Sequence, residues 1–184
     1  MPAGTIDERH QWPYWTEQAD KRFLIRNYGV NGERTDQIAR RLASVTQTVD
    51  VVIIQGGIND LVQGRRPSDA AAHIRAMMHR GKELGGLVAV ADVLPWNNGY
   101  PGGDGPIRDL NKLIHQLAKD EGVLLLRFYA TLEDPQRRGR MKEAWTTDGN
   151  HPSAHGHRRL GQLVLRAVGT SPTVNSPAGH GGSA

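Results

Sequence analysis

The sequence of 184 residues contains no cysteine, and only 5% of its residues are aromatic. Without cysteine, the chain can form no disulfide and can use no thiolate as nucleophile or metal ligand. This absence does not indicate a compartment, because cysteine-free chains occur on both sides of membranes. The hydrophobic share of 38% and the charged share of 23% are ordinary for a globular protein. The length fits one domain with a substantial core.

Long apolar runs and strong charge clusters are also missing. No stretch approaches the roughly 18 apolar residues of a membrane-spanning helix, and the opening "MPAGTIDERHQ" has no basic and apolar regions of a signal peptide. We therefore expect a cytoplasmic protein that does not associate with membranes. The net charge of +4 is small for a nucleic-acid-binding protein. The densest basic cluster, "PQRRGR", is interpreted as a solvated loop.

Strand-like and helix-like segments alternate along the chain. Apolar, β-branched runs predict strands at 22–27, 49–55, 87–94 and 123–129. Helical spacing of apolar residues predicts helices at 35–45, 67–84, 106–122 and 153–168, with Trp12 and Trp15 as core residues of an earlier helix. This alternation predicts an α/β fold, with a parallel sheet and helices on both faces. Residues 1–168 are expected to form one domain, and the Pro/Gly/Ser-rich residues 169–184 a disordered tail.

Three polar segments follow predicted strands: "YGVNGERT", "GGIND" and "PWNNGYPGGDG". Sites in parallel sheets lie beyond the carboxyl ends of the strands, so chemistry is expected there. In "GGIND", Asn59 can direct its side-chain amide at a developing negative oxygen, and Gly56 and Gly57 allow a close approach. Gly32 offers an unobstructed backbone N–H, and Asp60 can brace the turn. Each segment taken alone also fits an ordinary α/β turn.

The strongest local signal is "TTDGNHPSAHGH", in which Asp148 and His151 are three residues apart. In a tight turn the carboxylate can accept a hydrogen bond from Nδ1 of the imidazole, which leaves Nε2 free to take a proton from a hydroxyl. Two alternatives stay open. The segment can be a plain loop capped by Asp148, or His155 and His157 can join the pair around a zinc ion.

Taken together, "NYGVNGERT", "GGIND" and "DGNHPS" resemble, in order and spacing, conserved blocks of the SGNH (GDSL) hydrolase family of esterases and lipases. "LPWNNGYP" resembles the stretch after the third strand of bacterial members, and the resemblance covers roughly residues 12–168. It implies a three-layer α/β/α, flavodoxin-like fold and a small-molecule ester substrate, with no metal or organic cofactor. It also implies that His151 is the base, Asp148 its orienting acid, and Gly32 and Asn59 the oxyanion-hole positions. Trp96, Asn97 and Tyr100 would lie in a substrate-contacting loop, although Trp96 fits a packing role equally well.

One part of the family pattern is missing. The family carries its nucleophilic serine in a Gly-Asp-Ser motif at the end of a central first strand, and this sequence contains no such motif. Ser44 lies inside a predicted helix, and Ser153 is best explained as the N-cap of the last helix. Removing such a nucleophile costs on the order of 10⁶ in turnover. The resemblance therefore implies an esterase without its first strand and serine.

Three explanations stay open for the missing block: a longer working protein, a fragment, or a degenerate member that binds without cleaving. A metal-dependent hydrolase centred on the histidines is a further rival. The identity of the ester and the oligomeric state cannot be read from the sequence.

Overall fold

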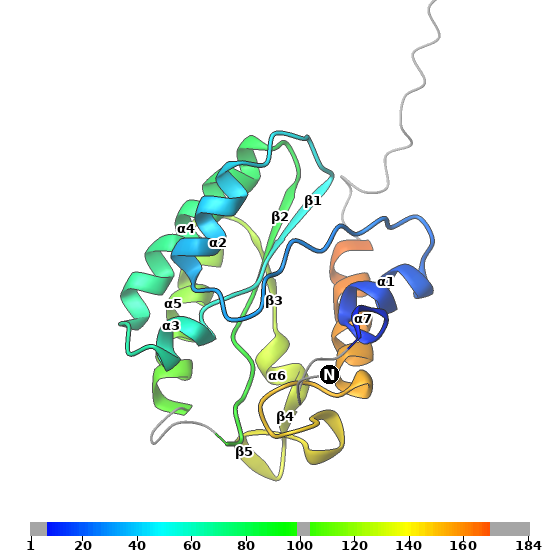
Figure 1. Cartoon of the computed structure of the whole chain (residues 1–184), viewed down its shortest axis with the longest axis vertical. Coiled ribbons are helices and arrows are strands. Elements are labelled where there is room, and N and C mark those ends of the chain that lie inside the picture. The colour runs from blue at the N-terminus through cyan, green and yellow to red at the C-terminus, as the bar shows by residue number, and fades with distance from the viewer. Residues whose placement is uncertain (1–6, 99–103, 170–184) are drawn as a thin grey trace, which may run out of the picture.

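The computed structural model describes residues 7–98 and 104–169, which fold around a parallel sheet (Figure 1). In this part of the chain the sheet has three strands, β1 (Val51–Ile54), β2 (Leu87–Ala91) and β3 (Leu124–Leu126), in the order β1-β2-β3. Val51 pairs with Leu87, and Ala89 with Leu124. All three strands run in the same direction, so their carboxyl ends share one edge.

Helices cover both faces of this sheet (Figure 1). One face carries α2 (Thr35–Ala43), α4 (Pro67–Glu83) and α5 (Asp104–Asp120), and the other carries α1 (Trp12–Ala19) and α7 (Ala154–Gly169). The shorter elements are η1 (Glu8–His10), α3 (Ile58–Val62), α6 (Phe128–Leu132), β4 (Glu133–Asp134), β5 (Arg137–Met141) and η2 (Glu143–Trp145). The predicted α/β class and its three layers are confirmed. None of the helices described here combines the length and apolarity needed to cross a membrane.

Alternation along the strands builds two cores. Val52, Ile54, Val88 and Val90 face α2, α4 and α5. Val51, Ile53, Ala89 and Ala91 face α1 and α7. The runs are apolar without interruption because successive side chains enter opposite cores.

The layer formed by α1 and α7 joins the two ends of the described chain. Thr16, fully buried in α1, donates its hydroxyl to the Gly161 carbonyl oxygen at 3.3 Å. A Cβ at Gly161 would lie 2.9 Å from the Trp12 carbonyl oxygen and 2.9 Å from Trp15 Cβ. Because Gly161 has no side chain, the two helices pack with their backbones in close contact. Trp12 also packs on the second core, as predicted for a residue of the first helix.

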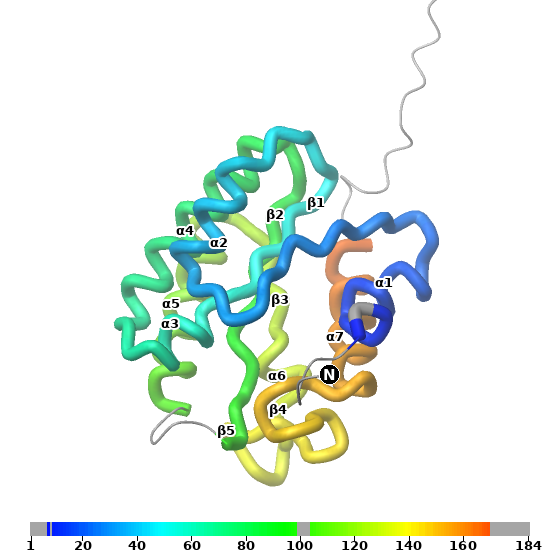
Figure 2. Tube along the Cα trace, in the orientation of Figure 1, coloured from blue at the N-terminus to red at the C-terminus, as the bar shows by residue number. Residues whose placement is uncertain are grey.

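The predicted strand at 22–27 is wrong. Residues 23–30 form no regular element, and Figure 2 shows the chain between α1 and α2 as one long crossing from the α7 side of the sheet to the α2 side. Leu24 is 85% exposed, Tyr28 51% and Val30 54%. A strand exists only when it pairs with a neighbour, and within the described chain β1 pairs with β2 alone.

The other predicted elements form, with shifted boundaries. The run 123–129 leaves the sheet after Leu126, because Phe128 begins α6. "PQRRGR" belongs to the β4–β5 hairpin and not to a loop, although its arginines are exposed as predicted. Thr35 is the first residue of α2, and Arg34 is its N-cap. Of the predicted tail, only Gly169, the last residue of α7, lies among the described residues.

Candidate active site

Asp148 and His151 form the predicted pair. Nδ1 of His151 lies 2.7 Å from Oδ2 of Asp148. The other carboxylate oxygen, Oδ1, accepts the backbone N–H groups of Asn150 and His151, both at 2.8 Å. The turn thus brings carboxylate and ring together locally, and Nε2 of His151 has no partner among the residues that the structure describes. The imidazole side chain is 56% exposed, so Nε2 is accessible to a hydroxyl.

The carboxylate of this pair stays ionised over a wide range. Partial burial opposes its charge, but the hydrogen bonds from the His151 ring and from the N–H groups of His151 and Asn150 lower the pKa of Asp148 to about 2. An ionised carboxylate fixes the Nδ1–H tautomer and favours the imidazolium that forms when Nε2 takes a proton. The pair is therefore suited to act as a base with its orienting acid.

The two predicted oxyanion positions also lie together. Asn59, in the first turn of α3, donates its side-chain amide to the Glu33 carbonyl oxygen at 2.9 Å. Gly32, directly before Glu33, has a φ of +81°. The Asn59 amide has two N–H groups, and this bond uses one of them. The same contact holds the Gly32 turn next to the amide.

Asp60 braces this region, as the sequence suggested. Its side chain is fully buried and accepts the backbone N–H and the hydroxyl of Thr35, both at 2.8 Å. The carboxylate satisfies one of the unpaired N–H groups at the start of α2. Asp60 thereby fixes α3, which carries Asn59, to the helix that follows Gly32.

The turn that carries Asn59 and the turn that carries His151 both contact the segment that follows β2, residues 92–98. Gly57 has a φ of +117°, and a Cβ there would lie 3.3 Å from Val93 Cγ2 and 2.7 Å from Leu110 Cδ2. The Asn97 N–H donates to the Gly149 carbonyl oxygen at 2.6 Å. Val93 and Asn97 therefore connect the Asn59 turn and the His151 turn to one stretch at the carboxyl edge of the sheet. Within the described residues, no hydrogen bond joins Asn59 directly to Asp148 or His151.

The other histidines of the motif do not join the pair. His155 is exposed on α7. Burial, with a smaller contribution from His151, lowers the pKa of His157 to about 4, and its buried Nδ1 has no hydrogen-bond partner in the described structure. Across residues 7–98 and 104–169, no three His, Asp or Glu side chains are gathered as metal ligands. The geometry gives the zinc alternative no support.

The remaining candidate side chains have structural contacts. Trp96 packs against the first core, which agrees with the packing alternative, and Tyr100 lies outside the described residues. The Ser153 hydroxyl accepts the Gly156 N–H at 3.2 Å and donates to the Ala144 carbonyl oxygen at 3.3 Å, as expected of the N-cap of α7. The Ser44 hydroxyl is bound to the Arg41 carbonyl oxygen at 2.7 Å.

An aspartate–histidine pair outside the predicted motifs was not anticipated. Asp92 follows β2 directly and is 2% exposed, and its Oδ2 lies 2.8 Å from Nε2 of His115. Its Oδ1 accepts the Tyr129 N–H at 2.7 Å. Burial raises the pKa of Asp92, against the opposing effect of these two hydrogen bonds. The partners are 23 residues apart, so no local sequence pattern indicates the pair.

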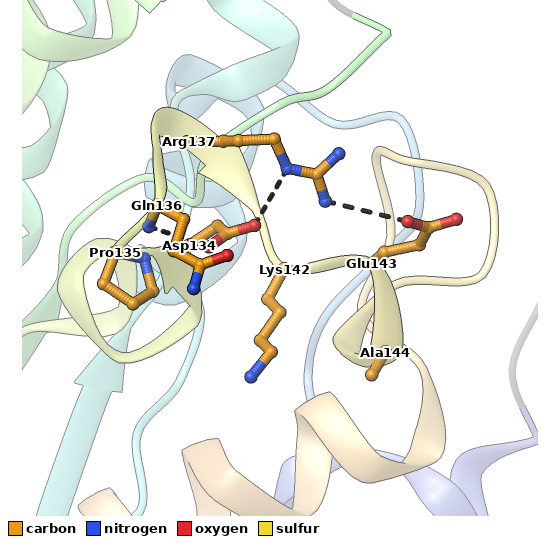
Figure 3. A pocket seen from close by; sticks show the side chains of 7 residues that line it. All are labelled: Asp134, Pro135, Gln136, Arg137, Lys142, Glu143 and Ala144. Carbon is orange, nitrogen blue, oxygen red and sulfur yellow. Dashed lines mark hydrogen bonds and ion pairs between the residues drawn. The ribbon is translucent and has the colours of Figure 1, made fainter.

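An open pocket of about 690 Å³ lies beside the β4–β5 hairpin and η2 (Figure 3). Its lining residues are Asp134, Pro135, Gln136, Arg137, Lys142, Glu143 and Ala144. Arg137 lies between two carboxylates, with Asp134 at 3.0 Å and Glu143 at 3.7 Å (Figure 3). None of the predicted site residues lines this pocket, and its Arg137 is paired with Asp134 and Glu143. We assign it no chemical role.

A family model supports the sequence resemblance. The model of the GDSL-like lipase/acylhydrolase family matches residues 2–159. The chain belongs to this family. No curated protein matches the sequence. Members of this family are lipases and acylhydrolases, so an enzyme of the esterase or lipase type is the function class that family membership supports.

Solved structures of GDSL proteins share the fold. A lipolytic protein of the G-D-S-L family from Veillonella parvula has a TM-score of 0.80 and 16% identity, over 92% of this chain and 93% of the other. A similar protein from Desulfitobacterium hafniense has a TM-score of 0.76 and 22% identity, over 90% and 91%. A variant of an acetyl-xylooligosaccharide esterase from Geobacillus stearmophilus has a TM-score of 0.70 and 20% identity, over 87% and 80%. At these identities the likeness establishes only the fold of the chain.

Proposed function

We propose that this GDSL family member hydrolyses carboxylic esters of small molecules by a serine mechanism, with the serine carried by a strand that residues 1–184 do not include. The observation that carries the proposal is the 2.7 Å contact between Nδ1 of His151 and Asp148, with Nε2 unoccupied. The contact of the Asn59 amide with the Glu33 carbonyl oxygen, directly after Gly32, supports the assignment of Asn59 and Gly32 as donors to the negative oxygen.

In this mechanism, Nε2 of His151 takes the proton of the serine hydroxyl while its oxygen attacks the ester carbonyl. Asp148 stabilises the imidazolium, and the Gly32 N–H with the Asn59 amide donates to the negative oxygen of the tetrahedral intermediate. The intermediate collapses, and His151 gives its proton to the departing alcohol. Water, deprotonated by the same nitrogen, then attacks the acyl-serine, and His151 returns the proton to the serine oxygen as the acid leaves.

The sheet offers a place for the serine strand. β1 has β2 as its only partner in the described structure, so its second edge carries unpaired backbone groups, which readily accept another strand. Leu24, Tyr28 and Val30 lie exposed in the unpaired crossing between α1 and α2. An added apolar strand would cover part of this surface and would end at the carboxyl edge if it ran parallel to β1.

The proposal is tested by hydrolysis of a short-chain chromogenic ester. The chain alone is compared with a fusion that places an apolar strand ending in Gly-Asp-Ser before Met1, and with the same fusion ending in Gly-Asp-Ala. Only the serine fusion should turn over ester, and His151→Ala should abolish its activity. A serine fusion that folds but is inactive would refute the proposal and favour the alternative, a GDSL-like module that binds without cleaving. Activity of the chain alone that depends on His151 would show that no added serine is needed.

A further inference from the structure

The turn that carries Asp148 and His151 is closed by its own contacts but not fixed to the sheet by them. Thr146 and Pro152 form an isolated antiparallel bridge, and the Thr147 N–H donates to the His151 carbonyl oxygen at 3.1 Å. The Asp148 side chain is 39% exposed and that of His151 56%, so neither side chain is held in place by its own burial. Its position relative to the strand ends must come from contacts outside the turn.

Two consecutive asparagines supply contacts of this kind. The Asn97 N–H donates to the Gly149 carbonyl oxygen at 2.6 Å, and the Asn98 N–H donates to Oδ1 of Asn150 at 3.2 Å. The side-chain amide of Asn98 donates to the Asp148 carbonyl oxygen. Three successive residues of the turn are thus bound by two successive residues of the β2–α5 connection.

The asparagine segment is itself firmly held. At its start, the Val93 N–H donates to Asn111 Oδ1 at 2.7 Å, and the Asn111 amide donates back to the Val93 carbonyl oxygen at 2.9 Å. At its end, Asn97 makes the same reciprocal pair with the backbone of Met141, at 2.5 and 2.8 Å. Because α5 and β5 fix this segment, it can transmit the position of β2 to the turn.

Gly149 shows how closely Asn98 approaches. Gly149 has a φ of +87°, and a Cβ there would lie 2.6 Å from Asn98 Nδ2 and 2.9 Å from its Oδ1. The left-handed backbone favours glycine at this position, and the absence of a side chain leaves the space that the Asn98 amide fills.

We propose that Asn98 is a positioning residue, which fixes the Asp148–His151 turn to the carboxyl edge of the sheet. Its amide orients the peptide group of Asp148, from which the carboxylate reaches the imidazole. Asn98 is exposed and does not support the core. The role of Asn98 in catalysis rests on the proposed function. Its role in fixing the turn is tested without any substrate.

The experiment compares Asn98→Ala and Asn98→Asp with the parent chain by ¹⁵N NMR. Relaxation of the amides of Gly149, Asn150 and His151 reports order in the turn. The ring nitrogens of His151 report its tautomer at about pH 9, where imidazoles are neutral. In the parent, the order parameters of the turn amides should be about 0.85. In both variants these order parameters should fall toward about 0.6. The ring signals should move toward those of an Asp148→Asn reference.

Asn27→Ala is the matched control. Asn27 is also exposed and binds the Gly29 N–H at 2.9 Å and Gln11 at 3.1 Å, away from the turn. This control should leave the turn and the ring signals unchanged. Ring signals at parent values in both Asn98 variants would overturn the proposal, even if the turn became more mobile. In the serine fusion, Asn98→Ala should lower kcat more than it changes KM. An inactive fusion with the NMR changes present would refute the proposed function and retain the positioning role.

Discussion

Two aspartate–histidine pairs in the described part of the chain have nearly equal contact distances and opposite environments. Asp148 and His151, 2.7 Å apart, lie on an exposed turn, and the pKa of Asp148 is lowered to about 2. Asp92 and His115, 2.8 Å apart, join the end of β2 to α5, and burial raises the pKa of Asp92. The difference shows that a short Asp–His distance does not by itself indicate a catalytic pair. Exposure of the carboxylate side chain, 39% for Asp148 and 2% for Asp92, distinguishes the two.

The orientation of the ring adds to this contrast. His151 binds its carboxylate through Nδ1 and leaves Nε2 open, whereas His115 uses Nε2 for Asp92. Both oxygens of Asp92 serve to connect elements, one through His115 and one through the Tyr129 N–H. We therefore interpret the buried pair as a structural link and the exposed pair as the chemical one.

The largest expected effect is on activity. In the serine fusion, His151→Ala should lower kcat/KM by on the order of 10⁴- to 10⁶-fold, because the proton acceptor is lost. His115→Ala should leave kcat/KM within a few-fold of the parent. Ester hydrolysis by the two purified variants checks this, with circular dichroism to confirm folding. Equal losses in the two folded variants would remove the distinction between the pairs.

The next effect is on stability and should have the reverse order. Asp92→Ala leaves the Tyr129 N–H without its acceptor in a partly buried site, which should cost about 1 to 3 kcal/mol in the free energy of unfolding. Asp148→Ala should cost less than about 1 kcal/mol, because its pair is exposed to solvent. Urea unfolding of the two variants measures both values. A larger loss for Asp148→Ala would show that the turn, and not the link to α5, supports the fold.

The smallest effect is on the pH dependence of stability. Because the folded-state pKa of Asp148 is lowered, its stabilisation is present above about pH 4 and is lost as the pH falls toward 2. Because the pKa of Asp92 is raised, its contribution to stability changes with pH in the opposite direction. Its contribution is full at low pH and declines as the pH rises through the folded-state pKa.

Unfolding free energies of Asp148→Asn and Asp92→Asn between about pH 2 and 7 test these signs. Relative to its variant, the parent should gain stability with rising pH in the first comparison and lose it in the second. Slopes of the same sign would contradict the assignment of opposite environments.

The sequence indicates the local part of this molecule better than the distant part. The helix at 67–84 and the pair Asp148–His151 were predictable because their contacts span a few residues. The prediction of a strand at 22–27 is wrong, since an apolar run becomes a strand only beside a neighbour, which the described sheet does not supply. The end of β3 was missed because "VLLLRFY" stays apolar where Phe128 already turns into α6.

The same rule applies to the candidate site. Asn59 and Gly32 could be named from their motifs, but their connection through the Glu33 carbonyl oxygen depends on the packing of α3 against α2. Asn98 and the pair Asp92–His115 carry no local signal, because their partners are 50 and 23 residues away. Only the fold brings these side chains together.

The close packing of α1 on α7 has a consequence for biosynthesis. The hydroxyl of Thr16 meets the Gly161 carbonyl oxygen across 145 positions of the chain, so α1 leaves the ribosome long before its partner helix is made. The strands and α2, α4 and α5 can assemble during translation, while one face of the sheet stays bare. That layer closes only once α7 has been synthesised and packs against α1.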